Sequence, residues 1–511
     1  MKTKFKLTAM QNLFKYICLL LLMVMTITAT AQSKRAKTTA TSGLLLRGTI
    51  RNYAGQPITI SRCAGDTLVV VDSTRTNEKG EFRFTADLSG FQNLTGLCKV
   101  KLADDQFFYL LCDGNPVEIK TVFEGSPFAN IATDSLQVIV QANSPAGVKK
   151  IAEENRQLYR FQRLQQQLNV ANYYLLPMMR MYPRVDKFHP QIEAEYLKRY
   201  EEMDQLVRQQ IKTDPDGMAT KISSAFYLPV NPDWKLRDPE RDSIIAAHFF
   251  DRFNPADPFY LRSNVLPEKM NIYLALRAGA PDKYNQSVPD ERLLSATASG
   301  FIEKTFKGTP VWNADDAFNF CLNYYLKKFN KEHREGAFLA LYDSWFKTQE
   351  GDCGTNAADR FSWARQKAGV LRGVEIGSIA PDFALEENGM KLSSITDDHI
   401  LLIFWASWCT HCQKEMPEIK VLLDSSGLKI TTIAVSIDTD ATAWENFVKN
   451  NGLTSWIHSS ELKGWKGNAP KLYNVYATPT MLLLDKEKRI LAKPDDVEQL
   501  KQALNQLKIK N

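Results

Sequence analysis

HILLIFWASWCTHCQKEMP, residues 399–417, joins a continuous apolar run to two cysteines three positions apart. Such a run is typical of a strand buried on both faces of a sheet, and the residues after it predict a helix that begins near Cys409 or Cys412. A cysteine at a helix N-terminus lies beside unpaired N–H groups and the positive end of the helix dipole, which favour the thiolate. The stretch therefore predicts a redox-active dithiol in which Cys409 attacks and Cys412 resolves the mixed disulfide.

His411 lies between the two cysteines and adds a hydrogen-bond donor and, when protonated, a positive charge near the Cys409 sulfur. A zinc site is one alternative, but a structural zinc needs four ligands, and the sequence has no second pair of cysteines with this spacing. A purely structural disulfide is also disfavoured, because so short a loop at a helix start is strained and easily reduced. We therefore expect a redox disulfide between Cys409 and Cys412, with no metal and no cofactor.

The chain after Gly373 alternates between strand and helix patterns. KITTIAVSID (429–438) reads as a second buried strand, and DATAWENFVKNNG (440–452) as an amphipathic helix that ends in glycine. Two further strands and a final helix follow. This order, βαβα followed by a β-hairpin and a helix, predicts a thioredoxin-like α/β domain over residues 373–511.

Three segments of this region carry a family resemblance. FWASWCTHCQKEMP, the upstream GSIAPDFAL and the downstream YATPTMLLLD look like the TlpA/ResA-like family of exported thiol–disulfide oxidoreductases, and the match covers about residues 373–508. The architecture of the whole chain resembles the multidomain members of this family in Bacteroidota. The resemblance implies a thioredoxin fold and a redox enzyme.

The resemblance also implies roles for individual residues. Pro479 matches a cis-proline that packs beside the dithiol and leaves the Thr478 backbone free to pair with a bound client segment. Glu415 matches a family glutamate that acts as proton acceptor for the buried thiol of Cys412, one helical turn away. Trp408 matches the tryptophan that flanks the dithiol and offers partners an apolar contact.

Two departures bear on the direction of electron flow. Thioredoxin itself has a buried aspartate six residues before its first cysteine, and Ile403 occupies that position here. A histidine before the second cysteine is similar to the oxidising or isomerising members of the superfamily, whereas family membership favours a reductase. We expect a reductase of periplasmic client proteins that carry disulfides or thiols, supplied by an upstream redox partner such as a membrane electron carrier.

Three alternatives compete with this interpretation. The first is a dithiol oxidase or disulfide isomerase that uses the same residues. The second is a peroxiredoxin, which shares the APDFAL segment but requires a proline and a threonine where Phe404 and Ala406 stand. The third is a cell-envelope binding protein whose dithiol is vestigial.

The chain upstream of Gly373 divides into two patterns. Seven short runs rich in β-branched and aromatic residues predict an all-β, sandwich-like domain over residues 43–142. A turn at Asp104-Asp105 would bring Cys98 close to Cys112, as a cross-strand disulfide or as two separate buried thiols. Residues 146–371 show helical periodicity without catalytic spacing. Cys321 falls in a helical stripe as a core thiol, and Cys353 in a glycine-bearing loop.

The first 31 residues read as a secretory signal peptide. Four lysines precede or border the apolar run ICLLLLMVMTI, and Ala29-Thr30-Ala31 supplies a cleavage pattern. The run is too short to span a bilayer. Without these lysines the formal charge of +6 falls to +2, which gives no argument for nucleic acid as a partner. The mature protein is therefore expected to be soluble and periplasmic.

Overall fold

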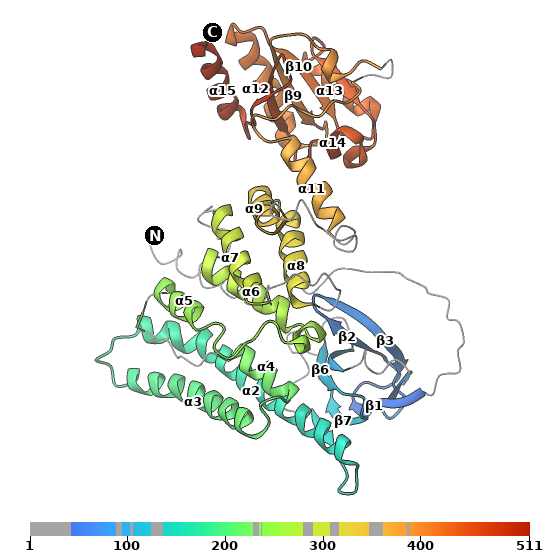
Figure 1. Cartoon of the computed structure of the whole chain (residues 1–511), viewed down its shortest axis with the longest axis vertical. Helices are drawn as coiled ribbons and strands as arrows, with labels where there is room; N and C mark the ends of the chain where they lie inside the picture. The colour runs from blue at the N-terminus through green and yellow to red at the C-terminus, as the bar shows by residue number, and fades with distance from the viewer. Residues whose placement is uncertain are drawn as a thin grey trace.

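The computed structural model describes ten stretches of the chain: 42–87, 95–102, 106–123, 136–227, 235–236, 238–279, 290–306, 316–346, 361–385 and 389–510. The predicted signal peptide, the Asp104-Asp105 turn and Cys353 lie outside these residues. Figure 1 shows the N-terminal strands and the helices that follow them packed side by side towards one end of the long axis, and an α/β domain at the other end. This order confirms the predicted fold class.

The N-terminal part consists of two four-stranded sheets. The strand order is β4-β1-β7-β8 in one sheet and β3-β2-β5-β6 in the other, and buried residues of both sheets belong to one hydrophobic core. Every strand that the sequence predicts is present, together with one short additional strand, β8. The strands are β1 (Ser42–Arg51), β2 (Pro57–Ala64), β3 (Thr67–Arg75), β4 (Glu81–Asp87), β5 (Gly96–Lys101), β6 (Phe107–Cys112), β7 (Val117–Val122) and β8 (Gln137–Ile139).

Cys98 and Cys112 lie on the adjacent antiparallel strands β5 and β6. Their register is offset, because Cys98 faces Leu110 and Cys112 faces Gly96. Both are free, buried thiols, which is the second of the two arrangements the sequence leaves open. Cys63 lies beside them, and burial, followed by the neighbouring Cys98, raises the pKa of Cys63 to about 12. The pKa of Cys112 is raised as well, by its hydrogen bond with Cys98 and by burial, so Cys63 and Cys112 are protonated core thiols at neutral pH.

The middle part is helical, as predicted, and continues the core of the sheets. The buried Asn155 side chain accepts a hydrogen bond from the Leu111 N–H at 2.8 Å and donates to the Leu111 carbonyl at 2.9 Å. Most buried residues of this part, including Cys321, belong to the same core as the strands, and a small separate cluster of Ala171, Met179, Ile192 and Tyr196 lies between the first two helices. The helices are α2 (Ala146–Met181), α3 (His189–Thr213), α4 (Met218–Phe226), α5 (Asp238–Ala247), η2 (Pro258–Arg262), α6 (Val265–Ala278), α7 (Glu291–Glu303), α8 (Ala317–Lys331), α9 (Glu335–Phe346) and α11 (Ser362–Gly373).

The C-terminal part is a five-stranded sheet of order β11-β10-β9-β12-β13. β9 is the central strand, parallel to β10 and antiparallel to β12, and separate hydrophobic clusters cover the two faces of the sheet. This is the predicted thioredoxin arrangement. Its elements are η4 (Leu392–Ser394), β9 (His399–Trp405), α12 (Thr410–Ser426), β10 (Thr431–Ser436), α13 (Ala441–Asn450), β11 (Ile457–Ser460), η5 (Gly464–Lys466), α14 (Asn468–Leu472), β12 (Thr480–Asp485), β13 (Ile490–Ala492) and α15 (Val497–Lys510).

No helix among the described residues combines the length and the apolar character needed to cross a bilayer.

Candidate active site at the Cys409–Cys412 dithiol

The dithiol lies where the central strand passes into a helix. β9 is buried along its length after His399, and Cys409 is the N-cap residue of α12, with its carbonyl accepting from the Gln413 N–H at 2.9 Å. Cys409 is partly exposed, whereas Cys412, one turn into the helix, is buried. A bulky disulfide can therefore reach Cys409 first.

The surroundings of Cys409 favour its thiolate. Burial by itself raises the pKa of a thiol, but hydrogen bonds with the Thr478 side chain and with the Cys412 N–H, and then with the Cys412 thiol and the His411 N–H, lower the pKa of Cys409 below its ordinary value. The backbone donors belong to the first turn of α12, where N–H groups lack partners within the helix. The lowered pKa agrees with the sequence prediction.

Cys412 has the opposite character. Burial raises the pKa of its thiol to about 12, although hydrogen bonds with the Ala406 backbone and the Thr478 side chain act against that rise. The neighbouring Cys409 raises it further. Cys412 is therefore a protonated thiol at neutral pH and needs a base before it can attack. The pair therefore consists of a partly exposed thiol with a lowered pKa and a buried thiol with a raised pKa.

Thr478 and Pro479 lie directly beside the dithiol. The Thr478–Pro479 peptide bond is cis, as the resemblance implies. The Cys409 Sγ donates to the Thr478 carbonyl at 3.2 Å, a contact that only the thiol form can make, whereas the hydrogen bond with the Thr478 side chain favours the thiolate. Thr480, the first residue of β12, pairs with Phe404 of β9, which fixes this loop beside the end of the central strand.

Glu415 lies on α12, one turn after Cys412, and is half-buried. Burial raises the pKa of its carboxyl, the charge of His411 acts against this, and Asp496 adds to it. Its Oε2 atom is buried and finds no hydrogen-bond partner among the residues the structure describes. The groups that hydrogen-bond to Cys412 are Ala406, Thr478 and Cys409, so a direct contact with Glu415 is not formed in this state.

His411 affects the two sides of the site in different ways. Its backbone N–H hydrogen-bonds to the Cys409 sulfur, while its exposed ring acts on the pKa of Glu415. The sequence interpretation placed the ring charge beside Cys409. In the structure, the main-chain N–H of His411 makes the hydrogen bond to the Cys409 sulfur, and the charge of the His411 ring acts on the Glu415 carboxylate.

Trp408 stands next to the dithiol with 55% of its surface exposed. It packs edge-on against Trp465 of η5, which is 42% exposed, with 6.4 Å between the ring centroids. The two rings form an exposed apolar surface beside Cys409. Sequence reasoning missed Trp465, since no motif links it to residue 408, more than fifty positions upstream.

A second residue missed from the sequence is Asp438, 1% exposed, two positions after the end of β10. It accepts hydrogen bonds from the Ser407 N–H at 3.0 Å, from the Ser407 hydroxyl at 2.7 Å and from the Ser436 hydroxyl at 2.7 Å. Asp438 therefore ties the residues just before Cys409 to the neighbouring strand. The one feature of the sequence that could have indicated this role is a carboxylate directly after the strand-like segment 430–437.

Ile403 is fully buried in β9 and belongs to the same hydrophobic cluster as Cys412. The position at which thioredoxin has its buried aspartate is therefore apolar in this protein. Of the sequence-predicted residues, only Glu415 brings a carboxylate to the Cys412 side of the helix.

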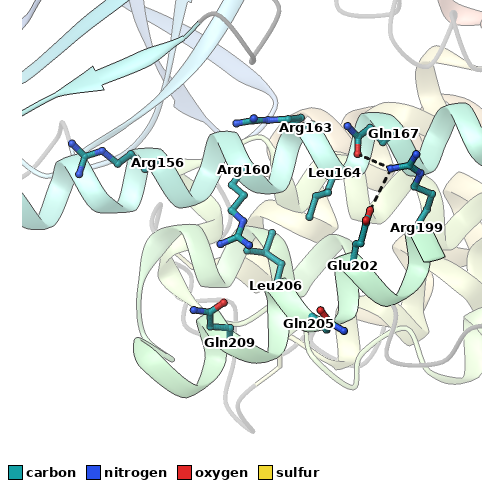
Figure 2. A pocket seen from close by; sticks show the side chains of 10 residues that line it. All are labelled: Arg156, Arg160, Arg163, Leu164, Gln167, Arg199, Glu202, Gln205, Leu206 and Gln209. Carbon is teal, nitrogen blue, oxygen red and sulfur yellow. Dashed lines mark hydrogen bonds and ion pairs between the residues drawn. The ribbon is translucent and has the colours of Figure 1, made fainter. Parts of the chain in front are cut away.

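The structure also contains a groove of about 700 Å³ between α2 and α3, far from the dithiol. Figure 2 shows arginines from both helices along it, with Arg199 joined to Gln167 and Glu202. The lining holds no cysteine. This groove plays no part in the dithiol chemistry.

Comparison with known proteins agrees with the geometry. A family model described as thioredoxin-like matches residues 397–490. The thiol–disulfide oxidoreductase ResA of Bacillus thuringiensis subsp. konkukian is 34% identical over 122 residues, covering 23% of this chain and 68% of the relative. The thioredoxin-like protein YneN of Bacillus subtilis is 35% identical over 119 residues, covering 22% of this chain and 68% of the relative. A solved thiol–disulfide oxidoreductase of Bacteroides fragilis is 31% identical, covers 26% of this chain and 99% of its own, and gives a TM-score of 0.23.

The sequence matches therefore reach the dithiol strand and helix and span two thirds of each curated relative. They cover 23% and 22% of this chain. On these grounds the chain belongs to the TlpA/ResA-like family of thiol–disulfide oxidoreductases.

Proposed function

We propose that this protein is exported to the periplasm, where its Cys409–Cys412 dithiol reduces disulfides of client proteins. The observation that carries the proposal is the contrast within the dithiol. Cys409 is partly exposed with a lowered pKa, and Cys412 is buried with a pKa raised to about 12. Cys409 is thereby suited to attack the client disulfide, and Cys412 stays protonated until it attacks the mixed disulfide. A two-step reduction requires these two roles.

The reaction balances as two thiol–disulfide exchanges. The Cys409 thiolate attacks one sulfur of the client disulfide, that S–S bond breaks, and the released client thiolate takes a proton. Cys412 then loses its proton and attacks the Cys409 sulfur, which forms the Cys409–Cys412 disulfide and releases the second client thiolate. Two electrons pass to the client, and an upstream dithiol donor, which we place in a membrane electron carrier, restores the reduced pair.

Glu415 is the group that we assign to the proton of Cys412. Its half-buried carboxyl has a raised pKa, and its Oε2 has no other hydrogen-bond partner among the described residues. A carboxylate with a pKa nearer neutrality is a more effective general base than an ordinary glutamate. His411, through its charge, adjusts the pKa of this carboxyl.

We place the client segment over the surface formed by Trp408 and Trp465, next to the Thr478–Pro479 loop. The two exposed tryptophans supply apolar area, and the Thr478 backbone borders the Cys409 sulfur at 3.2 Å. An extended segment that crosses this loop would hold its disulfide against Cys409, with main-chain hydrogen bonds giving affinity that is independent of sequence.

One observation favours the competing oxidase or isomerase. Every interaction that stabilises the Cys409 thiolate also stabilises the reduced pair, and so makes the couple more oxidising. The Thr410-His411 dipeptide acts in the same direction. The redox potential therefore decides between the two functions.

The test measures this potential by equilibrating the protein with glutathione and counting the free thiols of Cys409 and Cys412. A redox potential near roughly −270 mV supports the reductase, and a potential near roughly −120 mV contradicts the reductase and supports a dithiol oxidase. Dithiothreitol-dependent reduction of insulin gives the second readout. Turnover no greater than that of the Cys409→Ser variant would remove the catalytic function altogether.

A further inference from the structure

The helical region contacts the loop that carries Thr478. α8 and α9 are joined by a tight turn, in which His333 has a positive φ of 55°. The His333 ring stacks on the Tyr476 ring, with 3.7 Å between centroids and 16° between the planes. Tyr476 precedes Thr478 by two residues, so this stacking places the helical region next to the dithiol site.

Asn474 forms the second part of this contact. Its amide nitrogen donates to the Glu335 carboxylate at the start of α9, and its amide oxygen accepts from the Lys367 ammonium of α11. Both partners are charged, and hydrogen bonds to charged groups are the stronger class. Asn474 also has a positive φ of 52°, a conformation that asparagine adopts more readily than most residues.

A third contact across the interface comes from another segment of the C-terminal domain. The Lys493 ammonium, directly after β13, lies 3.8 Å from the same Glu335 carboxylate. Burial, followed by Glu335, raises the pKa of Tyr476, which agrees with its position against the helical region. In Figure 1, α14, which precedes Asn474, lies on the side of the C-terminal domain that faces α11.

These contacts occur just before the segment that touches the catalytic sulfur. Asn474 lies four positions before Thr478, whose carbonyl and side chain both interact with Cys409. Val475 is held as well, by its N–H to the Pro470 carbonyl at 2.8 Å. A displacement of Asn474 or Tyr476 therefore shifts Thr478 relative to the sulfur.

We propose that the α8–α9 turn and α11 of the helical region position the 474–478 segment, and that Asn474 and Tyr476 are thereby positioning residues for the Cys409 thiolate. The helical region is then part of the redox unit and sets the reactivity of the dithiol. The inference rests on the proposed dithiol chemistry and holds for either direction of electron flow.

The experiment changes the interface from both sides in the full-length protein. Asn474→Gly removes the amide that joins the two parts, and glycine tolerates the positive φ. The double variant Glu335→Ala, Lys367→Met removes the two hydrogen-bond partners of Asn474 and changes no residue of the C-terminal domain. Each change should weaken the hydrogen bond between the Thr478 side chain and the Cys409 thiolate. We therefore expect each change to raise the pKa of Cys409 by about one unit. We also expect the exchange equilibrium with glutathione to shift towards the Cys409–Cys412 disulfide.

The two sets of changes should not add. If both act through one interface, combining them gives the same pKa and the same equilibrium as either alone. Tyr476→Ala should produce a similar shift, and Tyr476→Phe, which keeps a ring for stacking, should restore the wild-type values. Glu332→Gln is the control, because it removes a charge from the same turn, where Glu332 pairs with Lys328 at 2.6 Å.

An unchanged pKa of Cys409 and an unchanged glutathione equilibrium in all interface variants would overturn the inference. So would shifts that add when the two sides are combined, or an equal shift in Glu332→Gln. Failure of the proposed function looks different, since the wild-type protein itself would then form no reversible Cys409–Cys412 disulfide.

Discussion

At the scale of single residues, the two cysteines of the dithiol should differ widely in reactivity. The pKa of Cys409 is lowered and that of Cys412 is raised to about 12. Because thiolate is the reactive form, alkylation of Cys409 by iodoacetamide should reach half its maximal rate below about pH 8.5, the value of an unperturbed thiol. Cys412, probed in the Cys409→Ser variant, should remain unmodified at pH 8. Equal alkylation rates for the two thiols would contradict the division of roles.

Glu415 gives a second prediction at this scale. Its raised pKa places its titration above that of an ordinary glutamate, so the carboxylate is lost as the pH falls through this higher value. The pH–rate profile for attack of Cys412 on a preformed Cys409 mixed disulfide, in which Cys409 no longer titrates, should therefore show an acid limb that Glu415→Gln removes. Turnover at neutral pH should fall by about 100-fold, the lower end for a general base.

Glu418→Gln is the matched control for this experiment, because Glu418 is an exposed carboxylate one turn further along α12. It should retain the rate and the acid limb, with the limb moved slightly to lower pH, because the charge of Glu418 contributes to the raised pKa of Glu415. An acid limb that persists in Glu415→Gln would assign the proton of Cys412 to another group.

At the scale of elements, Asp438 joins the ends of β9 and β10. It accepts from the Ser407 N–H, the Ser407 hydroxyl and the Ser436 hydroxyl, and it is almost fully buried. An asparagine at this position would place its amide N–H donors next to these donors, so at least one of the present hydrogen bonds would be lost. Asp438→Asn should therefore destabilise the C-terminal domain by roughly 1–3 kcal/mol, measured by denaturant unfolding.

Asp440 provides the matched control two residues further on. It caps α13 by accepting from the Thr442 and Ala443 N–H groups, and asparagine is an equally good N-cap residue. Asp440→Asn should leave the unfolding midpoint unchanged. An equal loss of stability in both variants would mean that Asp438 contributes no more than a surface cap.

The sequence predicted these elements well because their signals are local. A buried strand such as HILLIFW needs only its apolar run, and a helix start at Cys409 needs only the change of pattern that follows. Asp438 and Trp465 could not be identified in this way, because each gains its role from a partner brought close by the fold. The same holds for the stacking of His333 on Tyr476, whose residues lie far apart in the chain.

At the scale of the whole molecule, the β and helical parts form one unit and the C-terminal domain another. The largest hydrophobic cluster runs from Leu45 to Leu371 and includes both sheets and residues of most helices, while a small separate cluster joins α2 to α3. The two clusters of the C-terminal domain begin at Val374 and share no residue with it. The sequence predicted three regions, yet the first two share a core that only their packing reveals.

Two separate cores predict two unfolding transitions in calorimetry of the full-length protein. Phe301 is fully buried in the large cluster, against Phe250 and Tyr273, so Phe301→Leu should lower one transition, at a cost of about 1–2 kcal/mol. Asp438→Asn should lower only the other. The polar interface at Asn474 couples the units too weakly to merge them, because such contacts bury little apolar surface. A single transition that both variants shift together would show instead that the helical region and the dithiol domain unfold as one body.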